Sequence, residues 1–113
     1  MHTICHFEIP TTDLTKSETF FGKVFGWKCE RDSESYVVIH CDDGSTGGIY
    51  KVGEIKPSQV MIYIEVDDID KTLNDVVKNG GSEIEPKRSI GEYGFVGAFA
   101  DPCGGRVELW SKN

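Results

Sequence analysis

The chain has 113 residues, of which 38% are hydrophobic and 27% charged, and this composition predicts a single globular domain. Its 19 acidic and 12 basic side chains give a net charge of −7, which excludes nucleic acid and anionic membranes as expected partners. No apolar run reaches the length of a signal peptide or of a membrane span, so a cytoplasmic location is expected.

The first half of the chain has the pattern of a strand, a helix and three more strands. Residues 2–9 alternate as a strand, with His6 on the face away from the packed side. A helix is predicted from about residue 12 to 25, with Thr12 or Asp13 as its N-cap. The helical spacing of its apolar residues predicts that Phe20, Phe21, Val24 and Phe25 belong to the core. Strands are predicted at residues 27–31, 36–41 and 48–52.

The second half repeats this pattern after a linker predicted at residues 53–59. A strand at 60–66 precedes a helix that ends at 79–81. Strands follow at residues 82–86, 95–100 and 106–110, the last two joined as a hairpin by the turn at 101–105. The stretch 87–94 is irregular and contains two glycines, so it is predicted to be a lid over a pocket.

The two halves also match each other residue by residue. The segment 7–17 is echoed by 62–72, so that Asp13 corresponds to Asp68, and the same spacing carries Gly26 onto Gly81. This duplication predicts one α+β domain over residues 1–113, built from two βαβββ modules at about 1–54 and 60–113. The crevice between two such modules is the expected ligand site.

The four cysteines form no Cys-x-x-Cys pair, which argues against a zinc knuckle or a redox dithiol. Cys5, Cys29 and Cys41 lie in strand-like runs and are expected to be buried thiols. Cys103 lies in a Pro-Cys-Gly-Gly turn, where exposure is possible.

In four segments the chain resembles the vicinal oxygen chelate superfamily, which includes lactoylglutathione lyase, bleomycin and fosfomycin resistance proteins and extradiol dioxygenases. The segments are residues 6–14, 20–27, 47–50 and 99–109. The resemblance covers essentially the whole chain and implies a cupped eight-stranded mixed sheet with helices on its outside, and a homodimer. It identifies the reaction poorly, because members of this superfamily perform different chemistry.

In metal-using members the resemblance implies four ligands, one on the first and one on the last strand of each module. The opening position falls on His6 and the closing position on Glu108, whereas the other two fall on Met61 and Gly48. A thioether suits hard divalent ions poorly and glycine offers no donor, so only half of the family site is present. If a cofactor binds, we expect one divalent ion (Ni, Zn, Mn or Fe), with His40 as a candidate third ligand.

Two interpretations stay open for each residue of this half-site. His6 is a metal ligand or general base, or else a hydrogen-bonded strand histidine. Glu108 is a ligand or a catalytic base that removes a proton next to a carbonyl, or else a carboxylate paired with Arg106. The remaining residues predicted to line the ligand site are Tyr36, His40, Tyr50, Tyr63, Phe99, Arg106 and Trp110.

The resemblance therefore implies two classes of function. The first is a glyoxalase-like lyase or isomerase with an incomplete metal site, in which His6 and Glu108 act on a small molecule in the sheet cleft. The second is a metal-free protein that sequesters a small aromatic or cationic compound. We expect Met61→His together with Gly48→Glu to raise the affinity for a divalent ion sharply.

Overall fold

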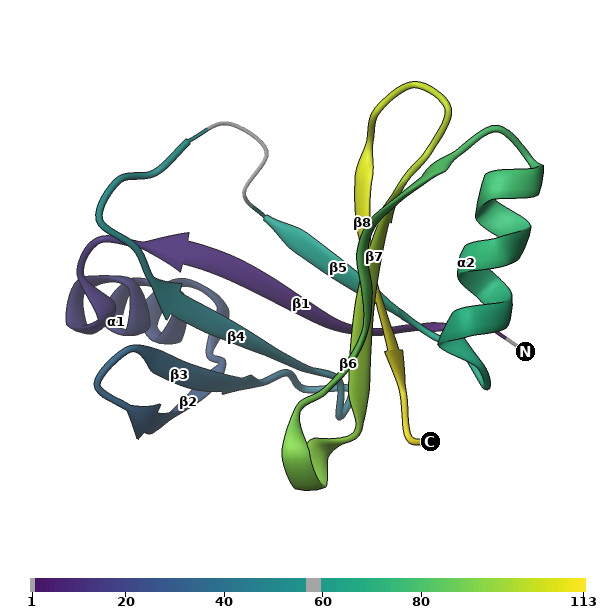
Figure 1. Ribbon diagram of the computed structural model, residues 1–113. Coiled ribbons are helices and arrows are strands. Elements are labelled where there is room, and N and C mark those ends of the chain that lie inside the picture. The colour runs from purple at the N-terminus through teal and green to yellow at the C-terminus, as the bar shows by residue number, and fades with distance from the viewer. Residues whose placement is uncertain (1, 57–59) are drawn as a thin grey trace. The chain divides into compact units, whose positions relative to one another are not determined.

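The structure is a computed structural model that describes residues 2–56 and 60–113. Its elements repeat the predicted βαβββ order, with a 3-10 helix (η1) added in the second half (Figure 1). In chain order they are β1 (Ile4–Thr11), α1 (Leu14–Phe25), β2 (Lys28–Ser33), β3 (Tyr36–His40), β4 (Thr46–Lys51), β5 (Met61–Glu65), α2 (Ile69–Lys78), β6 (Ser82–Ser89), η1 (Gly91–Tyr93), β7 (Phe95–Ala100) and β8 (Arg106–Ser111). The α+β prediction with eight strands is confirmed. Residues 57–59 of the predicted linker lie outside the described residues.

The chain forms two compact units, each of which is described here by itself. The N-terminal unit is His6–Met61, with the strand order β2-β3-β4-β1. The C-terminal unit is Ile62–Asn113 together with the residues before His6, with the strand order β5-β8-β7-β6. The start of the chain thus belongs with the second module, where the Glu65 amide donates a hydrogen bond to the Thr3 carbonyl at 2.8 Å.

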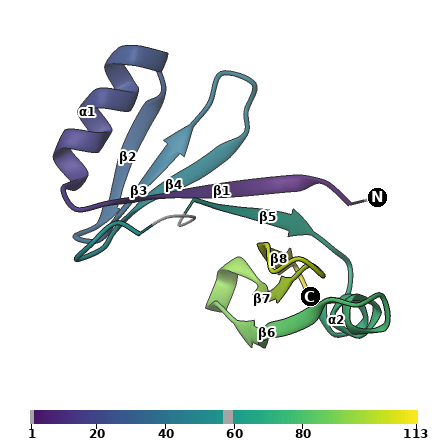
Figure 2. The ribbon, with the colours of Figure 1, turned by 90° about the horizontal axis from the view of Figure 1, so that it is seen from above.

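Both units pair their strands in the same way. β1 runs parallel to β4, and β5 runs parallel to β8, while the remaining pairs, β2–β3, β3–β4, β6–β7 and β7–β8, are antiparallel. This confirms the predicted mixture of strand directions. Figure 2 shows α1 on one face of the N-terminal strands and α2 beside β6 of the C-terminal unit.

Each helix begins with the same N-capping interaction. Asp13 accepts a hydrogen bond from the Lys16 amide at 3.1 Å, and Asp68 accepts one from the Lys71 amide at 3.0 Å. These side chains satisfy amides that the first helical turn would otherwise leave without a partner. Asp13, and not Thr12, is therefore the N-cap of α1. No helix of the described residues combines the length and the apolar character that crossing a membrane requires.

Each unit has its own core between helix and strands. In the N-terminal unit the buried residues are Leu14, Val37, Ile39 and Ile49, with Phe7, Phe21 and Trp27 packed against them. In the C-terminal unit they are Val66, Ile69, Leu73 and Leu109, with Ile64, Phe95 and Phe99 packed against them. Because side chains alternate along a strand, the neighbours of these core residues project from the helix-free face.

The predicted core role of the α1 side chains is wrong in part. Phe20, Val24 and Phe25 are 55%, 57% and 52% exposed, and only Leu14 and Phe21 reach the core. The strands cover only one side of α1, whereas the apolar side chains of α1 extend around more of the helix than this side. The exposed Phe25 ring packs against the partly buried Trp27 instead, with the two ring centroids 5.2 Å apart.

The prediction that residues 87–94 are irregular is wrong in part. Its first three residues continue β6 as far as Ser89, and Gly91–Tyr93 form η1. The Lys87 ammonium lies 4.5 Å from the centre of the Phe95 ring, and the Ile90 amide donates to the Gly94 carbonyl at 2.8 Å. Pairing with β7 thus orders a segment whose charged and glycine-rich sequence indicated a loop.

All four cysteines are free thiols, and the prediction of burial holds only in part. Cys5, Cys29 and Cys41 are half-buried, while Cys103 is exposed. Desolvation and, to a smaller extent, the neighbouring Glu65 carboxylate raise the pKa of the Cys5 thiol. A raised pKa lowers the thiolate fraction and makes Cys5 a poor nucleophile.

Candidate functional site

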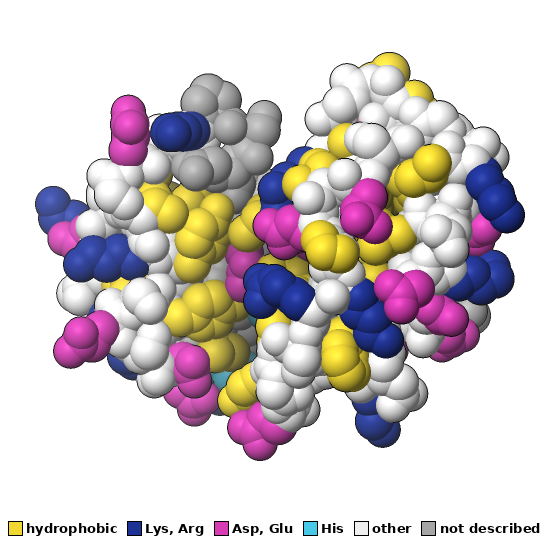
Figure 3. All heavy atoms as spheres, viewed as in Figure 1, with side chains coloured by type: hydrophobic (Ala, Val, Ile, Leu, Met, Phe, Trp, Pro, Cys, Tyr) yellow, Lys and Arg dark blue, Asp and Glu magenta, His cyan; other side chains and the backbone are white. Residues whose placement is uncertain are grey.

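The helix-free face of the N-terminal unit carries the first candidate site. Phe7 packs towards the core, so its neighbours His6 and Glu8 project from the opposite face of β1. Their side chains remain 28% and 15% exposed. Figure 3 shows this side of the unit, where hydrophobic side chains gather over β3 and β4. His6 and Glu8 thus lie next to each other on a largely apolar surface.

Tyr36 joins these two groups into a chain of hydrogen bonds. Its hydroxyl donates to Glu8 Oε2 at 2.8 Å and lies 2.9 Å from His6 Nε2. An ionised carboxylate only accepts hydrogen bonds, so the single phenol proton points to Glu8 and His6 Nε2 carries the proton that it donates to Tyr36. His6 is thus hydrogen-bonded to Tyr36 in this structure.

Gly48 makes this arrangement possible. It lies on β4 opposite Glu8 of β1 and Val38 of β3. A Cβ at Gly48 would overlap the hydroxyl and the ring of Tyr36. The Tyr36 ring crosses β4 through this space and reaches β1, which no larger residue at position 48 would permit.

The other two predicted residues of this face differ in how close they lie to His6, Glu8 and Tyr36. Tyr50 is the cross-strand neighbour of Tyr36 and is half-buried. His40 is exposed and lies opposite Thr46, which in turn lies opposite His6. His6 and His40 are thus two strands apart, a separation of about 10 Å between backbones. The structure does not bring His40 to His6.

The C-terminal unit carries the second candidate site. Glu108 is 4% exposed and accepts a hydrogen bond of 2.6 Å from Arg106 Nε. The same guanidinium donates to Glu85 at 3.2 Å. The Glu108 hydrogen bond, the Glu85 hydrogen bond and the two negative charges together raise the pKa of Arg106, although partial burial opposes them. Arg106 therefore stays charged and forms an ion pair with Glu108.

The predicted aromatic residues of this unit divide between two faces. Tyr63 lies opposite Glu108 in the parallel β5–β8 pair, and Trp110 lies two residues from Glu108 on β8. Both share the face of Glu108, and the Trp110 indole donates to the Tyr93 carbonyl at 2.7 Å. Phe99 packs against the core under α2 instead. Its side chain does not share a face with Glu108, because its neighbour Ala98 is the residue paired with Glu108.

Sequence reasoning did not include Glu8 among the residues of the ligand site. The signal that was available is its position two residues after His6, which places both side chains on one face of a strand. The contact of both with Tyr36 depends on the register of three strands and could not be derived from spacing along the chain.

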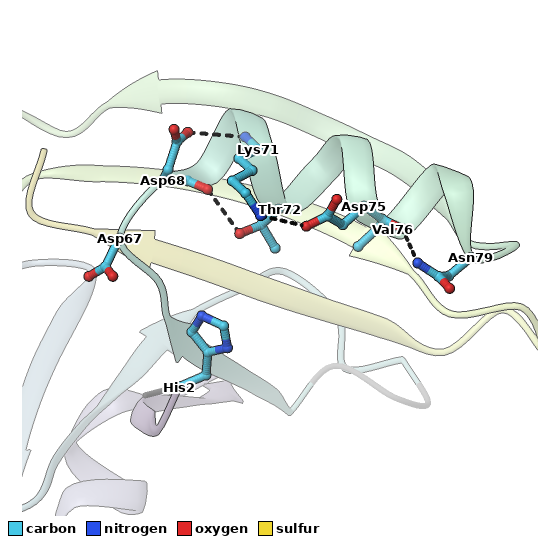
Figure 4. Close-up of a pocket in the computed structure, with 8 residues that line it drawn as sticks. All are labelled: His2, Asp67, Asp68, Lys71, Thr72, Asp75, Val76 and Asn79. Carbon is cyan, nitrogen blue, oxygen red and sulfur yellow. Dashed lines mark hydrogen bonds and ion pairs between the residues drawn. The ribbon is translucent and has the colours of Figure 1, made fainter.

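A separate open pocket of about 510 Å³ lies beside α2 in the C-terminal unit (Figure 4). Most of its charged and polar groups form hydrogen bonds or ion pairs within α2. Asp68 caps α2, Lys71 pairs with Asp75 at 3.0 Å, and Asn79 donates to the Asp75 carbonyl at 2.8 Å. His2 and Asp67 complete the lining. The charged and polar side chains of this pocket are therefore explained by the N-cap and the exposed face of α2.

The four ligand positions of the metal-using relatives do not fit a metal ion in this chain. His6 Nε2 donates to Tyr36, the Tyr36 hydroxyl fills the space above Gly48, and Glu108 is neutralised by Arg106. Met61 offers only a thioether. In the described part of the chain, no three His, Cys, Asp or Glu side chains are grouped so that they could hold a metal. No step of chemistry is derived through such an ion.

Two βαβββ modules of this topology define a protein of the vicinal oxygen chelate fold. The family model for the glyoxalase/bleomycin resistance protein/dioxygenase superfamily matches residues 3–109. The chain therefore belongs to this superfamily.

Individual relatives agree with this assignment. A glyoxylase-like domain-containing protein of Didymella fabae is 32% identical over 76% of this chain and 74% of its own length. The protein CFP32 of Mycobacterium bovis, named as a glyoxylase, is 26% identical over 94% of this chain but only 44% of its own length. The chain thus spans less than half of that relative.

A solved structure shows the same fold. The Mn(II)-bound glyoxalase of Novosphingobium aromaticivorans superposes with a TM-score of 0.72 at 15% identity, over 96% of this chain and 38% of that one. At this level of identity the likeness extends to the fold alone. The chain is a glyoxalase-like member of its superfamily, and its specific activity has to be argued from its own residues.

Proposed function

We propose that the protein binds a small molecule on the helix-free face that carries His6, Glu8 and Tyr36. The observation that carries this proposal is the convergence of three polar side chains from β1 and β3 on one point of a largely apolar, half-exposed surface. A few convergent polar groups on an apolar surface are typical of ligand sites, because they orient a molecule that apolar contacts hold.

The residues of this face favour a small aromatic or cationic ligand. Glu8 contributes a carboxylate, Tyr36 and Tyr50 contribute ring surface, and the chain as a whole has a net charge of −7. A cation is attracted both to a carboxylate and to the face of an aromatic ring. No cofactor is required for this function.

A thermal-shift screen tests this proposal. Aromatic amines, neutral aromatic compounds and aromatic carboxylates are compared on the wild type, Glu8→Gln and the surface control Glu30→Gln. The aromatic amines are expected to raise the melting temperature of the wild type and of Glu30→Gln, and this increase is expected to disappear in Glu8→Gln. If no class stabilises the protein, or if the increase survives in Glu8→Gln, the proposal is wrong.

Lyase or isomerase activity, with Glu108 as the base, is the second candidate. The position of Glu108 favours it, because Glu108 is 4% exposed and shares its face with Tyr63 and Trp110. The pairing with Arg106 argues against it, because the guanidinium already occupies Glu108 Oε1 at 2.6 Å. Formation of lactoylglutathione that disappears in Glu108→Gln but persists in Glu85→Gln would support this candidate.

We further propose that two copies of the chain associate, as the superfamily resemblance implies, and that they act in the cytoplasm. The exposed side chains Phe20, Val24 and Phe25 of α1 support association, because water-exposed apolar groups at helical spacing favour a partner. Light scattering on the wild type and on Phe20→Ser/Val24→Ser tests this. A dimer mass that falls to the monomer mass in the variant is expected, whereas a monomeric wild type would refute the proposal.

A further inference from the structure

We propose that the Asn79–Gly80 pair is a site of spontaneous deamidation, and that the C-terminal cap of α2 prevents the reaction until the last turn of this helix opens. In the sequence these two residues mark the end of the second predicted helix. The inference goes beyond the proposed function and does not depend on it, because it concerns only the end of a helix in the C-terminal unit.

The reaction needs only these two residues and water. The Gly80 backbone nitrogen loses its proton and attacks the side-chain carbonyl carbon, Cγ, of Asn79. The new N–Cγ bond closes a succinimide ring, and the Cγ–Nδ2 bond breaks, so that Nδ2 takes up a proton and leaves as ammonia. Water then opens the ring at either carbonyl and yields aspartate or isoaspartate. Glycine favours the attack, because it has no Cβ that obstructs the approach and its backbone rotates most freely.

In the folded chain the attacking atom and its target point away from each other. Asn79 has a ψ angle of 19°, which turns the Gly80 nitrogen towards the backbone nitrogen of Asn79 and away from its Cβ. The Asn79 side chain lies back along the helix, where Nδ2 donates to the Asp75 carbonyl at 2.8 Å (Figure 4). Closure of the ring therefore requires a rotation about ψ of Asn79 and the loss of this side-chain hydrogen bond.

Backbone hydrogen bonds of the cap oppose this rotation. The Gly80 amide donates to the Val77 carbonyl at 3.2 Å, and the Gly81 amide donates to the Val76 carbonyl at 2.9 Å. The first of these bonds also holds the proton that Gly80 must lose before it attacks. Gly81 is closely packed, because a Cβ there would lie 2.6 Å from the Ala100 carbonyl oxygen. The chain after the helix can thus rotate only when the last turn of α2 opens.

Deamidation would prevent the cap from forming again. A carboxylate at position 79 cannot donate the hydrogen bond that Nδ2 makes to the Asp75 carbonyl. Its charge would lie at the negative end of the helix dipole and one turn from the Asp75 carboxylate, and both placements are unfavourable. The isoaspartate product also lengthens the main chain by one carbon atom before Gly80. The opened end of α2 would therefore stay open.

Peptide mapping by mass spectrometry tests this site on the whole chain, incubated in mildly alkaline buffer either folded or unfolded in urea. Conversion of Asn79 is compared with that of Asn74, which lies in the same helix and precedes Asp75 instead of a glycine. In urea we expect Asn79 to convert at least about tenfold faster than Asn74. We also expect Asn79 to convert at least about tenfold faster in urea than in the folded chain, because the cap hydrogen bonds are then absent.

A pair of variants tests the role of the last helical turn. Lys78→Gly weakens the last turn of α2, because glycine is a poor helix former, and Lys23→Gly makes the same change in the last turn of α1. The folded-state rate of each variant is divided by its own rate in urea, which removes the effect of changing the residue before Asn79. This ratio is expected to rise about two- to fivefold in Lys78→Gly and to keep the wild-type value in Lys23→Gly.

Three results would overturn the inference. One is conversion in urea that is no faster at Asn79 than at Asn74, since the pair would then not be a deamidation site. Another is an equal rate at Asn79 in the folded and the unfolded wild type, since the cap would then give no protection. The third is an equal ratio in Lys78→Gly and Lys23→Gly, both shown to be folded by circular dichroism. These measurements involve no ligand, so their outcome is independent of the thermal-shift screen.

Discussion

The hydroxyl of Tyr36 lies where a side chain at Gly48 would begin. These residues belong to neighbouring strands, and position 48 is one of the four on which the superfamily resemblance places a metal ligand. The reach of Tyr36 towards His6 therefore depends on the absence of a side chain at position 48.

Gly48→Ala tests this dependence. The new Cβ would overlap the Tyr36 hydroxyl and ring, and such overpacking costs about 1–3 kcal/mol of the free energy of unfolding. Combining it with Tyr36→Ala removes the overlap, so the double variant is expected to be more stable than the sum of the two single losses predicts. Urea unfolding of the four proteins measures this coupling.

Gly53→Ala is the matched control for this cycle. Gly53 has no atoms near the position of a Cβ and no left-handed backbone conformation, so its substitution is expected to change stability by less than about 0.5 kcal/mol. Additive losses at positions 36 and 48 would mean that the Tyr36 ring moves away at little cost, and the argument from overlap would fail.

The same overlap changes the expected result of rebuilding the family metal site. Met61→His with Gly48→Glu supplies two ligand side chains, but the glutamate at position 48 would start inside the space of Tyr36. We expect the triple variant with Tyr36→Ala to bind zinc more tightly than the double variant in calorimetry. Equal affinities would show that Tyr36 does not block the position, and no gain in either variant would show that the assumed ligand register is wrong.

The pairing of Arg106 with the buried Glu108 gives a prediction about stability. Arg106→Met leaves a 4% exposed carboxylate without its strongest donor, and losing a hydrogen bond to a charged group costs about 1.5–3 kcal/mol. Glu85→Gln removes only the outer contact, which joins two side chains that are each 41% exposed, and is expected to cost less than about 1 kcal/mol.

A double substitution separates pairing from packing at this site. Arg106→Met with Glu108→Met replaces the pair by apolar groups, and such replacements are often neutral or stabilising. Urea unfolding is therefore expected to place the double variant above Arg106→Met in stability. The opposite order would mean that Glu108 stabilises the fold through groups other than Arg106.

Local patterns predicted most of the elements, because the signals involved act within a few residues. Asp13 as one of two candidate N-caps of α1, the end of that helix before Gly26 and the alternation of β1 all follow from residues within one turn or one strand. The exposure of Phe20 and the ordering of residues 87–89 were not predicted, because they depend on how far a sheet covers a helix and on pairing with β7.

The sequence analysis named residues for the candidate site but not the contacts between them. His6 and Glu108 were identified from the resemblance, and Tyr36 and Arg106 as lining residues. The contacts between these residues depend on the register of the strands and on Gly48, which lies on β4 between β1 and β3. The spacing of residues along the sequence reveals neither. Glu8 was missed as a site residue for this reason.

The hairpin between β7 and β8 gives a prediction about pH. The Asp101 carboxylate accepts hydrogen bonds from the Gly105 and Cys103 amides at 2.9 and 2.8 Å, and these bonds lower the pKa of Asp101 below its ordinary value of about 3.9. Because the folded state favours the ionised form, this contribution to stability is complete above pH 3.9 and is lost as the pH falls through the lowered pKa.

Asp101→Asn keeps an acceptor oxygen and removes the charge, so it isolates this effect. We expect amide exchange at Gly105 and Cys103 to be slower in the wild type than in Asp101→Asn at pH 6, after correction for the intrinsic exchange rates, and the difference to vanish near pH 2. NMR-detected hydrogen exchange across this range provides the measurement. A difference that is independent of pH would mean that the shape of the side chain, and not its ionisation, orders the turn.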